Sequence, residues 1–429
     1  MSRNDPDRFL NLLHEFKSEI EERWSEYFEY QALRIADDGS AEDIYDLVGA
    51  AYGLSLIVEP DLAKFNSIDK LFHWRLNDLC GPQEFASAQR SELLHAIRET
   101  QDRTRSETNA RALSVFDRFQ RKRIEHQGSA AIYLAAGEGH STVVILNALG
   151  HGLSYWRRLL DRLLPRHRIL IPDTSLTAAS AAGPSGITAQ VENLELILRH
   201  EKIASAHLLG WCTGPKVAVA FYRRCPSLVS SLILLNSSFT GSERRGELDT
   251  MYEQQLEHLC RALLEQPEMA SVVRKAFLAN TGEPDANQLS RMNAKELAVA
   301  VLSRSNADLK QHILDPFRSD AATIEYAQQV MDFLAYDAVA DAREVLAPVL
   351  LVGAEYDSVA APATTDFMAR QFPNAQAINI RGATHYCLYD RPGFIADLIE
   401  EFLANSEIAR DVVLPQALQF SPRQETLWI

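Results

Sequence analysis

Residues 206–221 read AHLLGWCTGPKVAVAF. An apolar run typical of a buried strand leads into a turn with glycine at positions 210 and 214, and a helical pattern follows at once. Cys212 is the middle residue of this Gly-x-Cys-x-Gly turn. Glycine on both sides avoids the side-chain collisions of a tight turn, and the helix behind it directs its amide dipoles at the thiol, which favours the thiolate. We therefore predict that Cys212 is a nucleophile presented at the carboxyl end of a strand.

Outward from this segment, short apolar runs alternate with helical patterns over most of the chain after residue 128. The predicted strands are residues 131–135, 142–147, 168–172, 206–211, 232–236, 349–352 and 377–380. The predicted helices among them include residues 154–164, 187–200 and 215–224, and a last one covers 392–403. Strands that alternate with helices predict an α/β fold with a mostly parallel central sheet covered on both faces.

Two segments depart from this alternation. Residues 1–125 are rich in charge and show helical periodicity, with helices expected at 6–36, 41–56, 67–79 and 82–123, so we predict an N-terminal helical domain. Residues 238–344 also read as helices and interrupt a core formed by 126–237 and 345–405. We predict that this insertion is a lid over the carboxyl ends of the strands. The C-terminal tail, 406–429, supports no prediction.

The composition of the 429 residues, 46% hydrophobic and 24% charged, is that of a globular protein. A formal net charge of −15 disfavours binding to a nucleic-acid backbone. The start of the chain lacks the pattern of a signal peptide, and no window approaches about 18 apolar residues in a row, so no membrane span is expected. Five cysteines, few and odd in number, are typical of reduced thiols. We therefore predict a cytoplasmic protein without nucleic-acid or membrane partners, and leave a homo-oligomer open.

Two acidic residues and a histidine follow the cysteine in the order expected for its partners. Residues 348–357 read PVLLVGAEYD, a strand that ends in a loop with Glu355 and Asp357. Residues 377–385 read AINIRGATH, the next strand and a loop with His385. In a catalytic triad the histidine takes the proton of the nucleophile and the acid orients the imidazole. We predict the triad Cys212, His385 and Asp357, with Glu355 as the alternative acid.

Residues 143–156 read VVILNALGHGLSYW, a strand, a glycine-bearing turn and the start of a helix. With this element, residues 129–405 resemble the α/β-hydrolase family, whereas residues 1–125 do not. The resemblance implies the α/β-hydrolase fold. It also implies an oxyanion hole built from a backbone N–H of this turn and the N–H of the residue after the nucleophile.

The turn departs from the family's usual pattern. Family members usually carry His-Gly at the end of this strand, where this chain has Asn147-Ala148. The resemblance then implies that the N–H groups of Leu149 and Thr213 are the oxyanion donors. In a shifted alignment, Leu153 replaces Leu149 because the residues before it are His151-Gly152.

No cofactor or metal site is predicted. The Gly-x-Gly pairs at 137–139 and 150–152 lack the third glycine and the ribose-binding acid of a dinucleotide site. Cys387 and Cys212 have no second pair of ligands at zinc spacing. Trp211, next to the nucleophile, is predicted to line an acyl pocket, with core packing as the alternative.

A cysteine in this turn forms an acyl-thioester enzyme. Relatives with Gly-x-Cys-x-Gly include polyhydroxyalkanoate synthases and dienelactone hydrolases, so both transfer and hydrolysis occur in the family, although neither matches this chain closely over its length. The leading hypothesis is acyl transfer or thioester cleavage on a small-molecule intermediate bound to coenzyme A or a carrier protein, in specialised metabolism. The alternatives are an ester or lactone hydrolase and a non-catalytic ligand-binding protein of the same fold.

Overall fold

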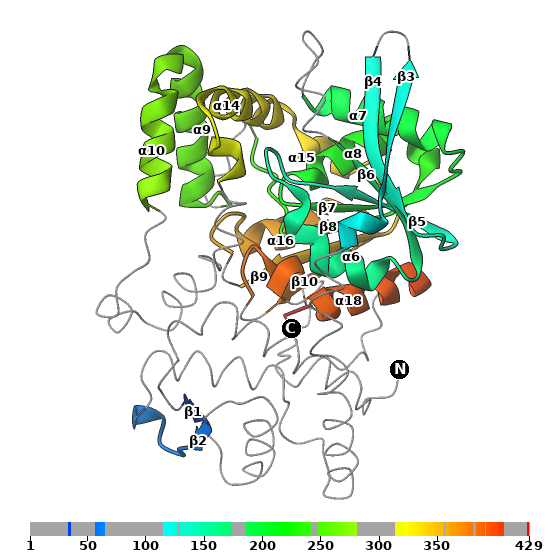
Figure 1. The fold of residues 1–429 in the computed structure, drawn as a ribbon. Helices are drawn as coiled ribbons and strands as arrows, with labels where there is room; N and C mark the ends of the chain where they lie inside the picture. The colour runs from blue at the N-terminus through cyan, green and yellow to red at the C-terminus, as the bar shows by residue number, and fades with distance from the viewer. Residues whose placement is uncertain are drawn as a thin grey trace, which may run out of the picture.

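The computed structural model describes residues 33–35, 56–64, 115–126, 129–173, 186–241, 248–280, 314–355, 357–380, 383–390, 392–406 and 427–428. A single sheet forms the centre of these residues (Figure 1). Its strands are β3 (Gln120–His126), β4 (Ser129–Ala136), β5 (Ser141–Leu146), β6 (His167–Pro172), β7 (Ala206–Trp211), β8 (Val229–Leu235), β9 (Val349–Ala354) and β10 (Ala375–Ile380), with the two-residue β11 (Leu427–Trp428) beside β10.

The sheet is mostly parallel, as predicted. Its strand order is β11-β10-β9-β8-β7-β5-β6-β4-β3. The neighbours from β6 to β11 are parallel, whereas β4 is antiparallel to both β3 and β6. Because the parallel strands share one direction, the loops after β5, β7, β8, β9 and β10 all leave from the same edge of the sheet.

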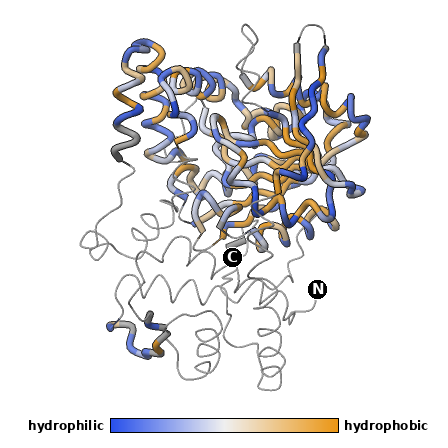
Figure 2. The backbone as a smooth tube through the Cα atoms, in the orientation of Figure 1, coloured by the Kyte–Doolittle hydropathy of each residue, from blue (hydrophilic) through white to orange (hydrophobic). Residues whose placement is uncertain are grey.

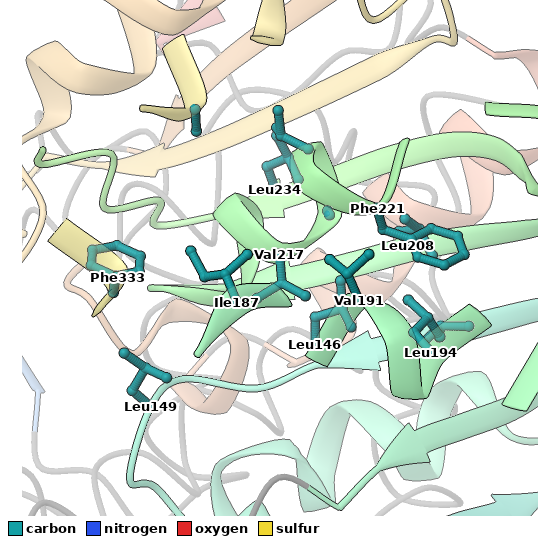
Figure 3. Packing of buried hydrophobic residues seen from close by; sticks show 14 of the residues in the cluster. Leu146, Leu149, Ile187, Val191, Leu194, Leu208, Val217, Phe221, Leu234 and Phe333 are labelled. Atoms are coloured by element: carbon teal, nitrogen blue, oxygen red, sulfur yellow. The ribbon is translucent and has the colours of Figure 1, made fainter. Parts of the chain in front are cut away.

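The central strands are apolar on both faces because helices cover both. Every residue of β9 is buried, and the strands beside it are nearly as apolar. One buried cluster lies between the sheet and helices α7 (Ile187–His200) and α8 (Gly214–Arg224), and a second lies against α6 (Arg157–Leu163) and α18 (Pro392–Asn405). Figure 2 shows the hydrophobic residues concentrated in the sheet. Figure 3 shows the first cluster, with side chains of α7 and α8 gathered around Leu146 and Leu208.

The described parts of the insertion are helical. They include α9 (Met251–Glu265), α10 (Ala270–Asn280), a 3-10 helix (Asp315–Phe317), α14 (Asp320–Ala335) and α15 (Ala338–Ala342). Figure 1 shows α9, α10 and α14 packed together at one end of the sheet. The Thr250 side chain accepts from the Glu253 N–H while the Glu253 side chain accepts from the Thr250 N–H, a capping box that fixes where α9 begins. Residues 242–247 and 281–313 of the predicted lid lie outside the described residues.

The structure corrects parts of the secondary structure predicted before residue 126. The helix expected at 82–123 gives way at its end to β3, an edge strand in which Ile124 alone is buried among residues 120–125. The charges of QRKRIEH stand at the edge of the sheet, where they hinder pairing with another chain, and they hide the strand pattern. Strands β1 (Leu33–Ile35) and β2 (Leu56–Val58) pair in parallel where two helices had been expected to end. The remaining residues of the helices expected at 6–36 and 41–56 lie outside the described residues.

None of the helices that the structure describes combines the length and the apolar character that a membrane crossing requires.

Candidate active site

Cys212 stands in a strained turn between β7 and α8. Its φ angle of 58° is in the left-handed region, which residues with a Cβ rarely adopt. A Cβ at Gly210 would lie 2.8 Å from the Pro215 nitrogen, and one at Gly214 would lie 2.0 Å from the Leu146 carbonyl oxygen. Both glycines are therefore required by close backbone approach. The turn leaves Cys212 half-buried at the start of α8.

His385 and Asp357 lie together in the loops after β10 and β9. The His385 Nδ1 is 2.9 Å from Asp357 Oδ2 and 3.0 Å from Oδ1, and both side chains are buried. Asp357 Oδ1 also accepts the backbone N–H groups of Val359 and Ala360, each at 2.8 Å. Of the two acids that the sequence left open, Asp357 rather than Glu355 is thus the one hydrogen-bonded to His385.

The third member, Cys212, completes the constellation. Burial lowers the pKa of the His385 imidazole, but the negative charges of Asp357 and Cys212 and hydrogen bonds to both side chains raise it to about 10. The imidazole is therefore protonated at neutral pH, with the Asp357 carboxyl group on one side and the Cys212 sulfur on the other. The structure brings all three predicted triad residues together.

The turn after β5 is braced by Asn147. Its Nδ2 donates to the carbonyl oxygens of His151, at 2.7 Å, and Gly152, at 3.2 Å. Its Oδ1 accepts the indole N–H of Trp156 at 2.8 Å. This residue, which departs from the family's pattern, holds the turn in shape, a role that the sequence analysis missed.

Of the two turn residues considered as oxyanion donors, Leu149 lies beside the elbow. Its N–H donates to the Thr213 hydroxyl, with 2.8 Å between the nitrogen and Oγ1. Leu153 stands further along the turn, at the start of a 3-10 helix (Leu153–Trp156). The structure therefore places the predicted pair, Leu149 and Thr213, in direct contact.

A pocket opens over Cys212 and His385. Its empty space is about 940 Å³, counted to the open mouth. Apolar side chains of the lid helices and the adjoining 3-10 helix form much of the wall: Leu256, Phe317, Val330, Phe333 and Leu334. The only charged side chains lining it, apart from the histidines, are Glu253 and Glu257 of α9, among the residues that the structure describes. The pocket suits a neutral, apolar acyl group.

Trp211 both lines the pocket and supports the triad. It is 1% exposed, and its indole N–H donates to the His385 carbonyl oxygen at 3.0 Å. Its ring lies against the His385 ring, with 5.2 Å between the centroids. The two predicted roles of Trp211, pocket lining and core packing, therefore coexist.

Lys216 joins the elbow helix to the lid. It is fully buried in α8, and its Nζ donates to the carbonyl oxygens of Thr240, Phe333 and Tyr336 at 2.6 to 2.9 Å. Phe333 and Tyr336 stand at the C-terminal end of α14, where a cation compensates the helix dipole. Sequence reasoning missed this residue, although a lysine within the apolar start of a helix is a signal of a buried partner.

Glu253 anchors the first lid helix beside the elbow. Its Oε1 accepts the hydroxyls of Ser238, at 2.6 Å, and Thr240, at 2.7 Å. The Ser238 N–H in turn donates to the Cys212 carbonyl oxygen at 2.8 Å. Burial raises the pKa of the Glu253 carboxyl, against the hydrogen bonds that lower it.

Within the described ranges, no three His, Cys, Asp or Glu side chains gather as a metal site.

Comparison with known proteins agrees with this architecture. Residues 141–392 match the family model described as alpha/beta hydrolase fold. MGS-M2, an alpha/beta hydrolase enzyme from a Medee basin deep-sea metagenome library, covers 68% of this chain over 100% of its own, with 17% identity and a TM-score of 0.51. A hydrolase from Pseudomonas aeruginosa PA01 covers 66% of this chain over 98% of its own, with 17% identity and a TM-score of 0.50. At these identities the likeness concerns the fold.

Two relatives identified by sequence carry names that describe an activity. A pimeloyl-[acyl-carrier protein] methyl ester esterase of Yersinia enterocolitica is 24% identical over 280 residues, which span 63% of this chain and 96% of the relative. RutD of Azorhizobium caulinodans, named as a carbamate hydrolase, is 24% identical over 269 residues, which span 61% of this chain and 90% of the relative. Both names describe hydrolysis.

Proposed function

Because this chain belongs to the alpha/beta hydrolase fold family, we propose that it is an ester hydrolase that carries the acyl group on Cys212. The observation that carries the proposal is the Cys212–His385–Asp357 constellation at the carboxyl edge of the sheet, at the floor of an apolar pocket. The relatives named for ester and carbamate hydrolysis support this function, one of the alternatives that the sequence left open, over the leading hypothesis of acyl transfer or thioester cleavage.

In the first half of the reaction, the Cys212 thiolate attacks the ester carbonyl carbon and forms the carbon–sulfur bond. The electron pair of the carbonyl moves onto its oxygen, and its return expels the alkoxide, which takes the proton of the His385 imidazolium. The raised pKa of His385 makes the imidazolium available for this step at neutral pH. Asp357 keeps the ring oriented throughout.

In the second half, His385 acts as a general base. Acylation removes the thiolate charge that helps to raise the pKa of the imidazole, so the neutral ring becomes easier to populate. It takes a proton from water as the water oxygen attacks the thioester carbon. The carbon–sulfur bond then breaks, the acid leaves, and the thiolate and imidazolium are restored.

The Leu149 and Thr213 N–H groups are the proposed oxyanion donors. The Thr213 hydroxyl, which accepts the Leu149 N–H, stands where an acceptor oxygen is expected in the reaction. In this mechanism the substrate oxygen displaces the hydroxyl.

Acyl transfer is the second candidate, and the residue that favours it is Cys212 itself. A thioester on Cys212 is more reactive toward amines and thiols than the oxygen ester of a serine enzyme. The donor would then be a thioester of coenzyme A or of a carrier protein, and the pocket would have to admit the acceptor while it excludes water.

The proposal is tested by intact-protein mass spectrometry after mixing with p-nitrophenyl esters and with acyl thioesters of matched chain length. We expect an adduct of acyl mass on wild type, none on Cys212→Ala, and release of the free acid from the esters. If most of the acyl group is recovered on an added amine or alcohol and not as the free acid, the reaction is acyl transfer. Ligand binding without an adduct or turnover in any series would identify a binding protein and exclude both.

A further inference from the structure

Asn236 follows β8 and stands beside the elbow. It is 1% exposed, and its φ angle of 44° is in the left-handed region. Its N–H donates to the Val352 carbonyl oxygen at 2.7 Å, and the preceding carbonyl, of Leu235, accepts the Cys212 N–H at 3.1 Å. Asparagine adopts this conformation more readily than most residues, so the backbone here suits the residue that it carries.

The side-chain amide of Asn236 joins the two loops that carry the acid and the histidine. Its Nδ2 donates to Asp357 Oδ2 at 3.0 Å. Its Oδ1 accepts the thiol of Cys387, with 2.8 Å between sulfur and oxygen. Cys387 is fully buried and stands two residues after His385. Each end of the amide is therefore bonded to a different loop of the active site.

The Cys387 thiol determines which end of the amide meets the carboxylate. A thiol donates its hydrogen to an oxygen, so Oδ1 faces Cys387 and the two hydrogens on Nδ2 are left for the other side. The reversed amide would set Oδ1 against the carboxylate oxygens of Asp357, which repel it. The hydrogen bond from Cys387 to Asn236 thus keeps the Nδ2 donor of Asn236 directed at Asp357.

We propose that Asn236 is a positioning residue for the triad, whose amide, oriented by Cys387, holds the Asp357 carboxylate facing His385. Asp357 Oδ1 is held by the N–H groups of its own loop, so without Asn236 its Oδ2 has only His385 to fix it among the described residues. The carboxylate could then turn, and the pairing of His385 with the Cys212 thiolate would weaken.

This inference rests on the proposed function for its meaning in turnover, but its test does not need a substrate. The readout is the rate of Cys212 alkylation by iodoacetamide as a function of pH, with a Cys212→Ser protein measured in parallel to subtract the other thiols. Wild type should stay reactive below the pH at which an ordinary thiol ionises, because the imidazolium maintains the thiolate.

Two substitutions of Asn236 remove the amide donor in different ways. Asn236→Gly keeps the left-handed backbone and deletes the side chain, whereas Asn236→Leu keeps a side chain of similar size that carries no hydrogen-bonding group. We expect alkylation at about pH 6 to fall roughly tenfold in both, the loss typical of one hydrogen bond to a charged group. On an ester that wild type cleaves, kcat should fall by a similar factor with little change in KM.

Further variants separate positioning from simple destabilisation. Cys387→Ala should reproduce part of the loss, and Cys387→Ser, which again offers a hydrogen-bond donor, should restore most of it. Asn379→Ala is the matched control, because Asn379 is also fully buried but donates to Asp366, outside the triad. It should lower stability and leave the alkylation profile in place.

Asn236 variants with the wild-type alkylation profile and wild-type kcat would overturn the inference, and so would an Asn379→Ala profile shifted as far as theirs. If wild type shows the low-pH reactivity and the Asn236 variants lose it, while no ester or thioester is turned over, the inference stands and the proposed function fails.

Discussion

The Leu149 N–H donates a hydrogen bond to the hydroxyl of Thr213, the residue directly after Cys212. The two residues proposed to hold the oxyanion are thus bonded to each other in the free protein. A substrate carbonyl must replace a hydroxyl group that is already well placed. The stabilisation that the Leu149 N–H gives to the oxyanion is therefore the difference between two hydrogen bonds. One is its bond to the Thr213 hydroxyl, and the other is its bond to the substrate oxygen, which becomes charged in the reaction.

This contact predicts opposite results for two substitutions of Thr213. Thr213→Ala removes the hydroxyl without filling its place, so kcat/KM should be retained or rise, while the unpaired Leu149 N–H lowers the free energy of unfolding by about 1 kcal/mol. Thr213→Val puts a methyl group in the same place, and kcat/KM should fall roughly 100-fold. Steady-state kinetics on one ester check both. A loss of that size in the alanine variant would instead make the hydroxyl a donor in the reaction.

The pH dependence of stability should report the charge on His385. In the folded protein, burial lowers the pKa of the imidazole, but Asp357 and Cys212 raise it to about 10, whereas the ordinary value is 6.5. A pKa raised on folding stabilises the protein fully below the unfolded value, and the contribution disappears as pH rises through the folded value. The difference in unfolding free energy between wild type and His385→Gln, measured in urea, should therefore shrink between about pH 6 and about pH 10. A difference that grows over this range would show a neutral imidazole in the folded state.

Lys216 should contribute far more to the free energy of unfolding than a lysine at the protein surface. Lys216→Met keeps the length of the side chain but removes the ammonium donor that the Thr240, Phe333 and Tyr336 carbonyl groups share. We expect the free energy of unfolding to fall by about 3 kcal/mol. Lys275→Met, at an exposed position of α10, is the control and should stay within about 0.5 kcal/mol of wild type. Equal losses in the two variants in urea titrations would contradict a specific role for Lys216.

The lid wall should limit the length of the acyl chain. Val330 of α14 is 4% exposed and lines the pocket, so Val330→Phe narrows it without touching the triad. On p-nitrophenyl esters, kcat/KM for octanoate should fall at least tenfold, or about 1.4 kcal/mol, while the value for acetate stays near that of wild type. The acetate substrate is the internal control for correct folding. Parallel losses on both esters would mean that the acyl chain does not reach Val330.

The sheet was predictable because its central strands are buried on both faces and therefore appear as short apolar runs. The predicted strand at 206–211 coincides with β7, and the other predicted strands fall on sheet strands. The edge behaves differently: β3 packs the apolar Ile124 into the core, while Lys122 on the same strand is half-buried in an ion pair with Glu201, so the strand shows no apolar alternation. An edge strand of this kind is defined by its partner β4, which a local pattern does not contain.

The proximity of Cys212, Asp357 and His385 was predictable for a related reason. The carboxyl ends of parallel strands meet at one edge, so residues after β7, β9 and β10 are brought together by the topology alone. The polar residues that support them were not predictable. Asn236 and Lys216 act through partners more than 100 residues away in the sequence. The partners of Asn147 are near in the sequence, but its bonds depend on the shape of the turn, which the residue pattern does not give. A helical period also does not say which face of α9 or α14 turns toward Cys212.

The bond network of Lys216 bears on how the pocket selects its ligands. One ammonium group joins the end of α14 to α8, the helix that begins two residues after Cys212, so a shift of the wall formed by Phe333 and Leu334 would stretch these hydrogen bonds. These bonds then hold the distance from the Cys212 sulfur to the wall of Phe333 and Leu334 nearly constant. Such a pocket would select by size. Acyl chains longer than the distance from the sulfur to the wall would not fit, and shorter acyl chains would bind and leave part of the pocket empty.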